Sequence, residues 1–192
     1  TSANELVVNG MSSSFRNGRF ANSGIVTEVR VSDLMDYEKY GDLACLKFQE
    51  ELEEMSFKLG GLTQNAPAQR LTDFLSGRLS SSLPETSYHP GLVSSDLNLL
   101  FPGFIKESLK AGLKLIGNKA RGFVTGEAIV AGLESRTSSP VRIPRDKETM
   151  EHIQIKGLYP CGEGAGYAGG IVSSALDGEI CAEKICEKLN IR

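Results

Sequence analysis

The sequence has little of what several classes of protein need. It contains no tryptophan and only two histidines, His89 and His152, and its apolar runs span only a few residues. A membrane-spanning helix needs about 20 consecutive, mostly apolar residues, so the sequence predicts none. No basic segment followed by an apolar stretch marks a secretory signal. We therefore expect a cytoplasmic protein with no membrane partner.

Neither sign of charge dominates the chain. Its 192 residues include 21 Lys and Arg and 24 Asp and Glu, which gives a net charge of −3. Proteins that bind nucleic acid usually have a cluster of basic residues on their surface. The balanced charges of this sequence do not favour such a cluster, so we expect no nucleic-acid partner. Hydrophobic residues make up 40% and charged residues 23% of the sequence, as in ordinary folded proteins. The length suffices for one ordinary domain or two small ones.

The four cysteines show no metal-binding pattern. Cys45, Cys161, Cys181 and Cys186 form no Cys-x-x-Cys pair, and neither histidine is close to any of them in the sequence. The sequence therefore predicts no metal site. We expect reduced thiols and, for Cys161, a buried position in the core.

The spacing of apolar residues predicts a mixed α/β fold. Runs of β-branched and other apolar residues predict strands at 24–31, 127–134 and 157–161. Apolar residues three and four apart predict helices at about 42–59, from Pro102 onward, and at about 170–189. A shorter helix is predicted from Pro67 to Leu75, followed by a loop over 76–95.

The change in periodicity along the chain predicts four segments. A strand-rich body is formed by residues 1–35 and 119–156, and a mainly helical subdomain is inserted between them at 36–118. Residues 157–192 are predicted to be a C-terminal cofactor-binding segment, in which a short strand leads through a glycine-rich loop into the last helix.

This glycine-rich loop carries the clearest chemical signal in the sequence. Five of the nine residues from Gly162 to Gly170 are glycine, and the loop leads directly into the last predicted helix. Glycine lets backbone amides approach a ligand closely. A helix N-terminus adds unpaired N–H groups and a partial positive charge, which suit a phosphate or an electron-rich carbonyl. The arrangement therefore predicts a site for a nucleotide-type cofactor.

Residues 164–169 match the dinucleotide fingerprint G-x-G-x-x-G. That fingerprint requires a complete β-α-β unit, whose second strand ends in an acidic residue about twenty positions further on. Here Glu183 and Glu187 stand at about that distance, but both fall within the predicted helix. We therefore expect the loop to bind another part of the cofactor, with the β-α-β unit supplied elsewhere.

Several segments together point to a known family: 158–171 around the glycine loop, and 9–12, 21–23, 48–52, 66–70, 73–75 and 134–142. These segments resemble the bacterial FAD-dependent dehydrogenases described as NAD(FAD)-utilizing, which are relatives of the two-dinucleotide-binding-domain flavoproteins. The resemblance covers nearly the whole chain but does not include the adenine-side glycine motif. It implies that the chain is a C-terminal fragment of such a flavoprotein.

The resemblance also implies roles for particular residues. Glu163 would accept a hydrogen bond from a ribityl hydroxyl of FAD, and the helix N-terminus would stabilise negative charge on the reduced flavin. The backbone amides of Gly169, Gly170 and Ile171 would face the flavin pyrimidine edge or nearby phosphates. The resemblance leaves the catalytic residues open. The full set of predicted cofactor-binding residues is Gly162, Glu163, Gly164, Gly166, Tyr167, Ala168, Gly169, Gly170 and Ile171.

The expected function follows from this resemblance. The full-length protein would be a FAD-dependent oxidoreductase, a dehydrogenase of a small-molecule substrate, with NAD(P) as a candidate electron donor or acceptor. This chain would supply the flavin-side part of the FAD site and a substrate-facing cap. It would need the missing N-terminal FAD-binding portion as its partner and would be inactive alone.

Two alternative functions and the role of three arginines stay open on the sequence. The chain could be a non-catalytic nucleotide-binding module that uses the glycine loop as an anion nest, or a flavoprotein fold retained for binding a partner. The arginines at 136, 142 and 145 could bind an anionic substrate or a cofactor phosphate, or could form ordinary solvated surface.

Overall fold

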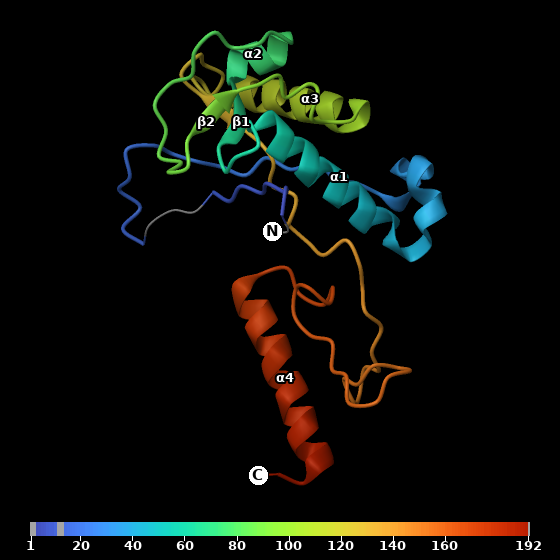
Figure 1. The fold of residues 1–192 in the computed structure, drawn as a ribbon. Coiled ribbons are helices and arrows are strands. Elements are labelled where there is room, and N and C mark those ends of the chain that lie inside the picture. The colour runs from blue at the N-terminus through green and yellow to red at the C-terminus, as the bar shows by residue number, and fades with distance from the viewer. Residues whose placement is uncertain (1–2, 11–13, 192) are drawn as a thin grey trace. The chain divides into compact units, whose positions relative to one another are not determined.

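A computed structural model describes residues 3–10 and 14–191 of the protein. Met11 and Ser12, which contribute to the resemblance, lie outside the described residues. The described part of the chain has a mixed α/β architecture, with four α-helices and a small three-stranded sheet (Figure 1). The predicted mixed α/β class is confirmed. None of the described helices is long and apolar enough to cross a membrane.

The described residues divide into two compact units. The first comprises those of Thr1–Met35 and Phe48–Ser135, and the second those of Asp36–Lys47 and Arg136–Arg192. The first unit contains the sheet, and the second contains the glycine-rich loop and the last helix. The division into four segments at residues 36, 119 and 157 stays a prediction.

The sheet of the first unit has the strand order β2-β1-β3. Its central strand β1 (Ala66–Arg70) pairs in parallel with β2 (Leu92–Ser94) and antiparallel with β3 (Ile129–Ala131). The helix predicted from Pro67 is therefore wrong at its start, because residues 66–70 form a strand and only α2 (Leu71–Ser76) is helical.

Pro67 in a central strand is unusual, because proline cannot donate to the ladder. Its carbonyl still accepts a hydrogen bond from the Gly132 N–H at 3.0 Å. The carbonyl of Gly132 accepts from the Ser56 hydroxyl at 3.4 Å instead of from residue 67. The side chain of Ser56 thus partly replaces the missing backbone donor, which explains why a proline is tolerated here.

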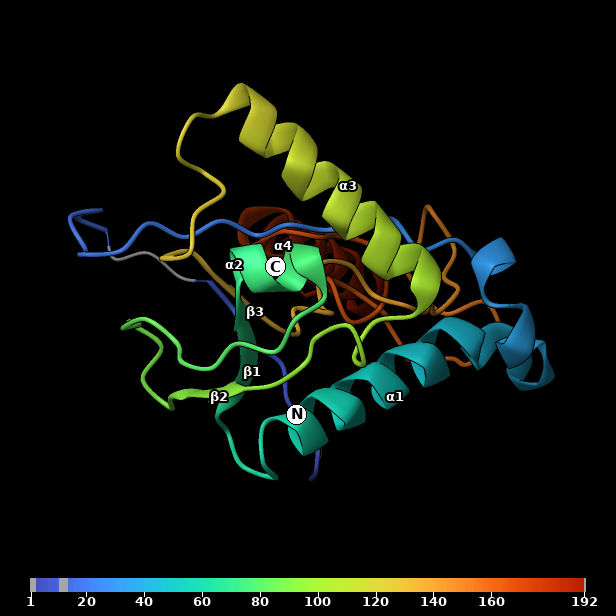
Figure 2. The same ribbon diagram turned by 90° about the horizontal axis from the view of Figure 1, so that it is seen from above.

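Two long helices were predicted correctly, α1 (Ala44–Leu59) and α3 (Gly103–Lys119). All of α3 and residues 48–59 of α1 belong to the first unit. Each carries apolar residues at helical spacing, and these side chains pack on the buried core. Figure 2 shows α1 and α3 approaching each other at their N-terminal ends. The rings of Phe48 and Phe104 lie there with centroids 6.4 Å apart.

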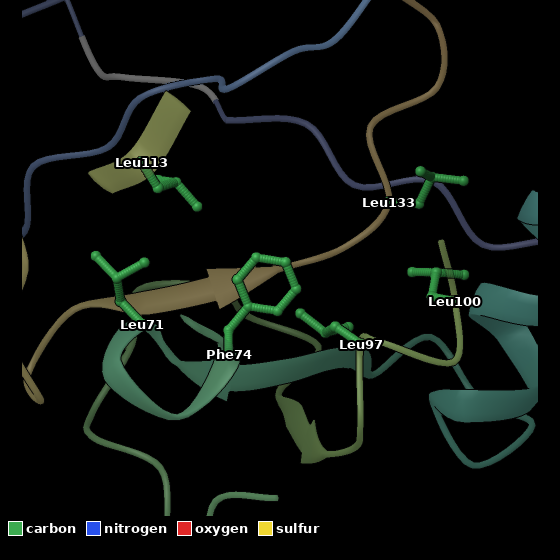
Figure 3. Packing of buried hydrophobic residues seen from close by; sticks show 6 residues of the cluster. All are labelled: Leu71, Phe74, Leu97, Leu100, Leu113 and Leu133. Carbon is green, nitrogen blue, oxygen red and sulfur yellow. The ribbon is translucent and has the colours of Figure 1, made fainter. Parts of the chain in front are cut away.

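The core of the first unit lies between the sheet and the helices. Six buried hydrophobic side chains face one another in it (Figure 3): Leu71, Phe74, Leu97, Leu100, Leu113 and Leu133. Both polar atoms of the buried Gln69 amide have a partner, because its nitrogen donates to the Arg78 carbonyl at 2.6 Å and its oxygen accepts from the Leu97 N–H at 2.8 Å. Burial of an amide is tolerated when such partners are present.

The strands predicted at 24–31 and 157–161 are wrong. Residues 24–30 have no regular structure, and Val31–Asp33 forms a short 3-10 helix, η1. Val26 and Val31 are 63% and 74% exposed, so neither contributes to a buried sheet face. Residues 158–161 have no regular structure either. β-Branched residues favour a strand only where a neighbouring strand and a core are available.

The second unit is built around α4 (Ile171–Leu189), as predicted. Residues 136–170 have little regular structure and run alongside this helix (Figure 1). An isolated bridge joins Arg145 to His152. The unit also contains most of the 3-10 segment η2 (Met35–Leu43), which is kinked at Gly41.

Candidate cofactor-binding site

The glycine-rich loop forms a compact turn just before α4. The Gly166 N–H donates to the Glu163 carbonyl at 2.9 Å, and the Tyr167 N–H donates to the Gly162 carbonyl at 3.0 Å. A second segment supports the turn, because the Ile143 N–H donates to the Ala165 carbonyl at 3.1 Å. The loop therefore has a defined path of its own, and Ala165 at its centre is buried.

Two glycines of the loop are required by the fold of the chain. Gly162 has φ +70° and Gly166 has φ +82°, a region that residues with a Cβ atom rarely adopt. At Gly166 a Cβ atom would also stand 2.6 Å from the Val141 carbonyl oxygen. The backbone conformation of the loop therefore explains why positions 162 and 166 are glycine, and no ligand is needed to explain them.

Three other glycines of the loop are not required in this way. Gly164, Gly169 and Gly170 do not have a positive φ, and a Cβ atom would meet nothing within 4 Å at Gly164. At Gly169 and Gly170 the nearest atoms would lie at ordinary contact distances of 3.7 and 3.4 Å. The chain itself could accept side chains at all three positions, so its own packing does not explain why these residues are glycine.

The N-terminus of α4 lies directly after these glycines. The Gly170 N–H donates to the Ser173 hydroxyl oxygen at 3.1 Å, so this amide is already paired within the chain. The N–H groups of Gly169 and Ile171 have no acceptor among the described residues. These two amides remain available to a ligand, with the positive end of the helix dipole behind them.

The Glu163 side chain stands in the turn and is half-buried. Its backbone carbonyl closes the turn with Gly166. No hydrogen bond or ion pair within the described part of the chain uses its carboxylate. A carboxylate is an acceptor with up to about four lone-pair sites, so Glu163 is available to accept from a hydroxyl group of a ligand.

A buried ion pair holds the loop to α4. The Arg145 guanidinium donates to both carboxylate oxygens of Asp177, at 2.6 and 3.0 Å, and the two side chains are only 8% and 15% exposed. Asp177 also accepts from the Gly162 N–H at 2.8 Å. Arg145 further donates to the Pro160 carbonyl at 2.7 Å. The Arg145–Asp177 pair thus holds the backbone at Pro160 and at Gly162, where the chain enters the loop.

The hydrogen bonds from Arg145 are the main reason that the pKa of Asp177 lies below its ordinary value, and the N–H of Gly162 adds to the effect. Sequence reasoning missed this pair, because Asp177 is one of many polar residues on the last helix and its partner is 32 residues away.

Tyr167 is the aromatic member of the loop. Its ring lies under two guanidinium groups, with 3.6 Å from the ring centroid to Arg145 and 4.4 Å to Arg142. Its hydroxyl donates to the Ile143 carbonyl at 2.9 Å. The ring is therefore held firmly, and it lines two neighbouring hollows of the second unit.

The smaller hollow has a volume of about 260 Å³ and is lined by Ser138, Ser139, Gly166, Tyr167, Ala168 and Gly169. Four of these six residues belong to the predicted cofactor site. The structure thus brings these four predicted residues together in one small depression. Two serines that the sequence reasoning did not assign to the site complete its wall, and the signal that could have found them is their place in segment 134–142, which carries part of the resemblance.

One other sequence expectation is corrected by the structure. Cys161 was expected to be buried and is exposed, because no strand forms around it. The buried thiol is Cys181 on α4, whose pKa is raised by burial. His152, which stood alone in the sequence, accepts hydrogen bonds from the N–H groups of Gln154 and Ile155 at 3.0 Å each. Its ring therefore stabilises a local turn.

Over residues 3–10 and 14–191, no group of three or more His, Cys, Asp or Glu side chains is arranged to hold a metal ion.

Comparison with known proteins identifies the family. Residues 1–137 match the family described as "FAD-dependent protein, C-terminal domain-like". This match covers more than half of the chain, and the chain belongs to this family. The matched region includes all three strands and ends before the glycine loop.

A relative extends the similarity through the loop. An uncharacterized protein of Clostridium beijerinckii (strain ATCC 51743 / NCIMB 8052) is 41% identical over 188 residues, which are 97% of this chain and 34% of the relative. The chain thus spans about a third of the length of this relative. The family and the relative support a flavoprotein part and do not name a reaction.

Proposed function

We propose that this chain supplies the flavin-side part of the FAD site in a longer FAD-dependent oxidoreductase. The observation that carries the proposal is the set of three glycines that the fold does not need, at 164, 169 and 170, placed before the N-terminus of α4. Membership in a family of FAD-dependent proteins supports FAD as the ligand that approaches them.

The residues present fit such a cofactor by their chemistry. Glu163 would accept from a ribityl hydroxyl, and the N–H groups of Gly169 and Ile171 would bind a carbonyl or phosphate oxygen. FAD, when bound, supplies the hydride and electron transfer chemistry of the enzyme. The chain would hold the cofactor in place, stabilise negative charge on it through the helix N-terminus, and exclude water on this side.

The finer assignment, a dehydrogenase that uses NAD(P) as its electron partner, rests on the resemblance alone. The same holds for the substrate-facing cap, the small-molecule substrate and the missing N-terminal portion. The alternative of a non-catalytic nucleotide-binding module differs in one respect that can be measured, because it requires no redox reaction of a bound flavin.

The visible absorption spectrum of the purified full-length protein tests the proposal. We expect the bands of an oxidised flavin, and we expect denaturation to release free FAD, since nothing in the proposal requires a covalent bond. Anaerobic addition of NADH or NADPH should bleach these bands. A protein that stays colourless after incubation with FAD would refute the proposed function. A flavin that binds but is bleached by neither nucleotide would contradict the NAD(P) assignment.

A further inference from the structure

The larger of the two hollows that Tyr167 lines contains none of the other residues of the glycine-rich loop. It has a volume of about 480 Å³ and opens to solvent, and we call it the basic pocket. It is lined by Arg142, Pro144, Arg145, Lys147, Met150 and Tyr167. Three of these residues are cationic and none is acidic, which makes the pocket a candidate site for an anion.

The charges of the basic pocket are only partly compensated. Arg145 is neutralised by its bidentate pair with Asp177. No ion pair among the described residues includes Arg142 or Lys147. Two neighbouring carboxylates are already engaged, because Glu151 binds Lys188 and Asp146 accepts from Glu148 and Thr149. The pocket therefore carries two positive charges that have no ion-pair partner among the described residues.

The position of one of these charges is well defined. The Arg142 guanidinium lies 4.4 Å from the centroid of the Tyr167 ring, and the Tyr167 hydroxyl is bound to the Ile143 carbonyl. Stacking on a fixed ring limits the freedom of the guanidinium, so less entropy is lost when it binds a ligand. A guanidinium with free N–H groups is suited to the two oxygens of a carboxylate.

The rest of the lining is apolar and suits an organic body next to the anionic group. Pro144, Met150 and the Tyr167 ring offer hydrocarbon, thioether and aromatic surface. An inorganic anion would leave this surface without contact. Apolar walls with a few placed polar groups are the usual arrangement of a small-molecule site.

We propose that the basic pocket binds a small organic acid, with its carboxylate at Arg142 and Lys147 and its apolar body against Met150, Pro144 and Tyr167. Assignment of this acid as the substrate rests on the proposed function, because Tyr167 also lines the hollow of the predicted flavin-side loop. Binding of the acid does not depend on that function.

The test uses benzoate as the probe and the full-length protein, with and without added FAD. Ligand-observed NMR titration would compare benzoate with benzamide, which has nearly the same shape and no charge, and with inorganic phosphate, which has charge and no apolar body. We expect benzoate to bind at least tenfold more tightly than benzamide and than phosphate. Either comparison probe binding as tightly as benzoate would overturn the proposal.

Variants locate the binding. Arg142→Gln and Lys147→Gln should each weaken benzoate binding at least fivefold, and both should fold, because these side chains are exposed and take part in no ion pair. Arg121→Gln, an exposed cation of the first unit, is the matched control and should leave benzoate binding unchanged. Unchanged binding in both pocket variants would place the acid elsewhere and overturn the proposal. If benzoate binds as expected while FAD does not bind, only the proposed function fails.

Discussion

At the scale of single residues, the glycines of the loop fall into two groups. Gly162 and Gly166 are needed for the backbone path, whereas Gly164, Gly169 and Gly170 are not. The sequence could not separate these groups, because every glycine looks the same until its φ and its neighbours are known. The density of glycine predicted a ligand site, and only the structure shows which of the glycines the backbone path requires.

The Glu163 carboxylate provides a prediction at this scale. Glu163→Ala in the full-length protein should weaken FAD binding roughly ten- to a hundred-fold, because a charge-assisted hydrogen bond contributes about 1.5–3 kcal/mol. Glu163→Gln keeps one acceptor oxygen and should weaken binding less. Fluorescence titration of the apoprotein with FAD measures both.

The loop should keep its fold in both Glu163 variants, since only the backbone carbonyl of this residue closes the turn. Glu179→Ala, which removes an exposed carboxylate from α4, is the control and should not change the FAD affinity. If Glu163→Ala binds FAD as tightly as the parent protein, the carboxylate is not a cofactor ligand.

At the scale of elements, the long helices were predictable, and among the strands only β3 was, which lies within the strand predicted at 127–134. The stripes of α1, α3 and α4 repeat every three to four residues, and this local pattern is enough to place a helix within a few residues. A strand depends on a partner far away in the sequence. β1 pairs with β3 about 60 residues later, and its sequence Ala-Pro-Ala-Gln-Arg gives no sign of it.

The same limit applies to the contact between the loop and α4. The Arg145–Asp177 pair joins two segments that are 32 residues apart and fixes the Gly162 amide. Since its formation depends on tertiary packing, no spacing rule identifies it. The resemblance to flavoproteins identified the loop as a candidate site, but it did not identify Arg145 and Asp177 as the residues that stabilise the loop.

This pair makes the stability of the chain pH-dependent. The folded-state pKa of Asp177 is depressed, so its contribution is present at neutral pH and is lost as the pH falls below about 4, through the folded pKa. Asp177→Asn should lower the free energy of unfolding by about 3 kcal/mol at pH 7. Urea unfolding at a series of pH values measures the difference.

The difference between Asp177→Asn and the parent should shrink steadily at acidic pH, when Asp177 is protonated in both states of the parent. Glu179→Gln, on the exposed side of the same helix, should show no such trend. A constant difference from pH 7 to pH 3 would show that the variant acts through packing and not through the charge of Asp177.

At the scale of the whole molecule, the two kinds of comparison cover different parts of the chain. The family match lies over residues 1–137, which contain the sheet and its core, and the similarity to the clostridial protein includes nearly all of the chain. The chain spans about a third of that relative. The central claim, that the loop before α4 is the flavin-side part of an FAD site, therefore has to be tested in the full-length protein.

The most direct measurement compares FAD affinity with thermal stability in two glycine variants. Gly169→Ala adds a methyl group where the chain leaves room, whereas Gly166→Ala places one at 2.6 Å from the Val141 carbonyl in a backbone with positive φ. We predict that Gly169→Ala keeps the melting temperature of the apoprotein and loses at least about tenfold in FAD affinity, or about 1.4 kcal/mol. Gly166→Ala should destabilise the fold by about 2 kcal/mol or more. Unchanged FAD affinity in a folded Gly169→Ala protein would contradict the account.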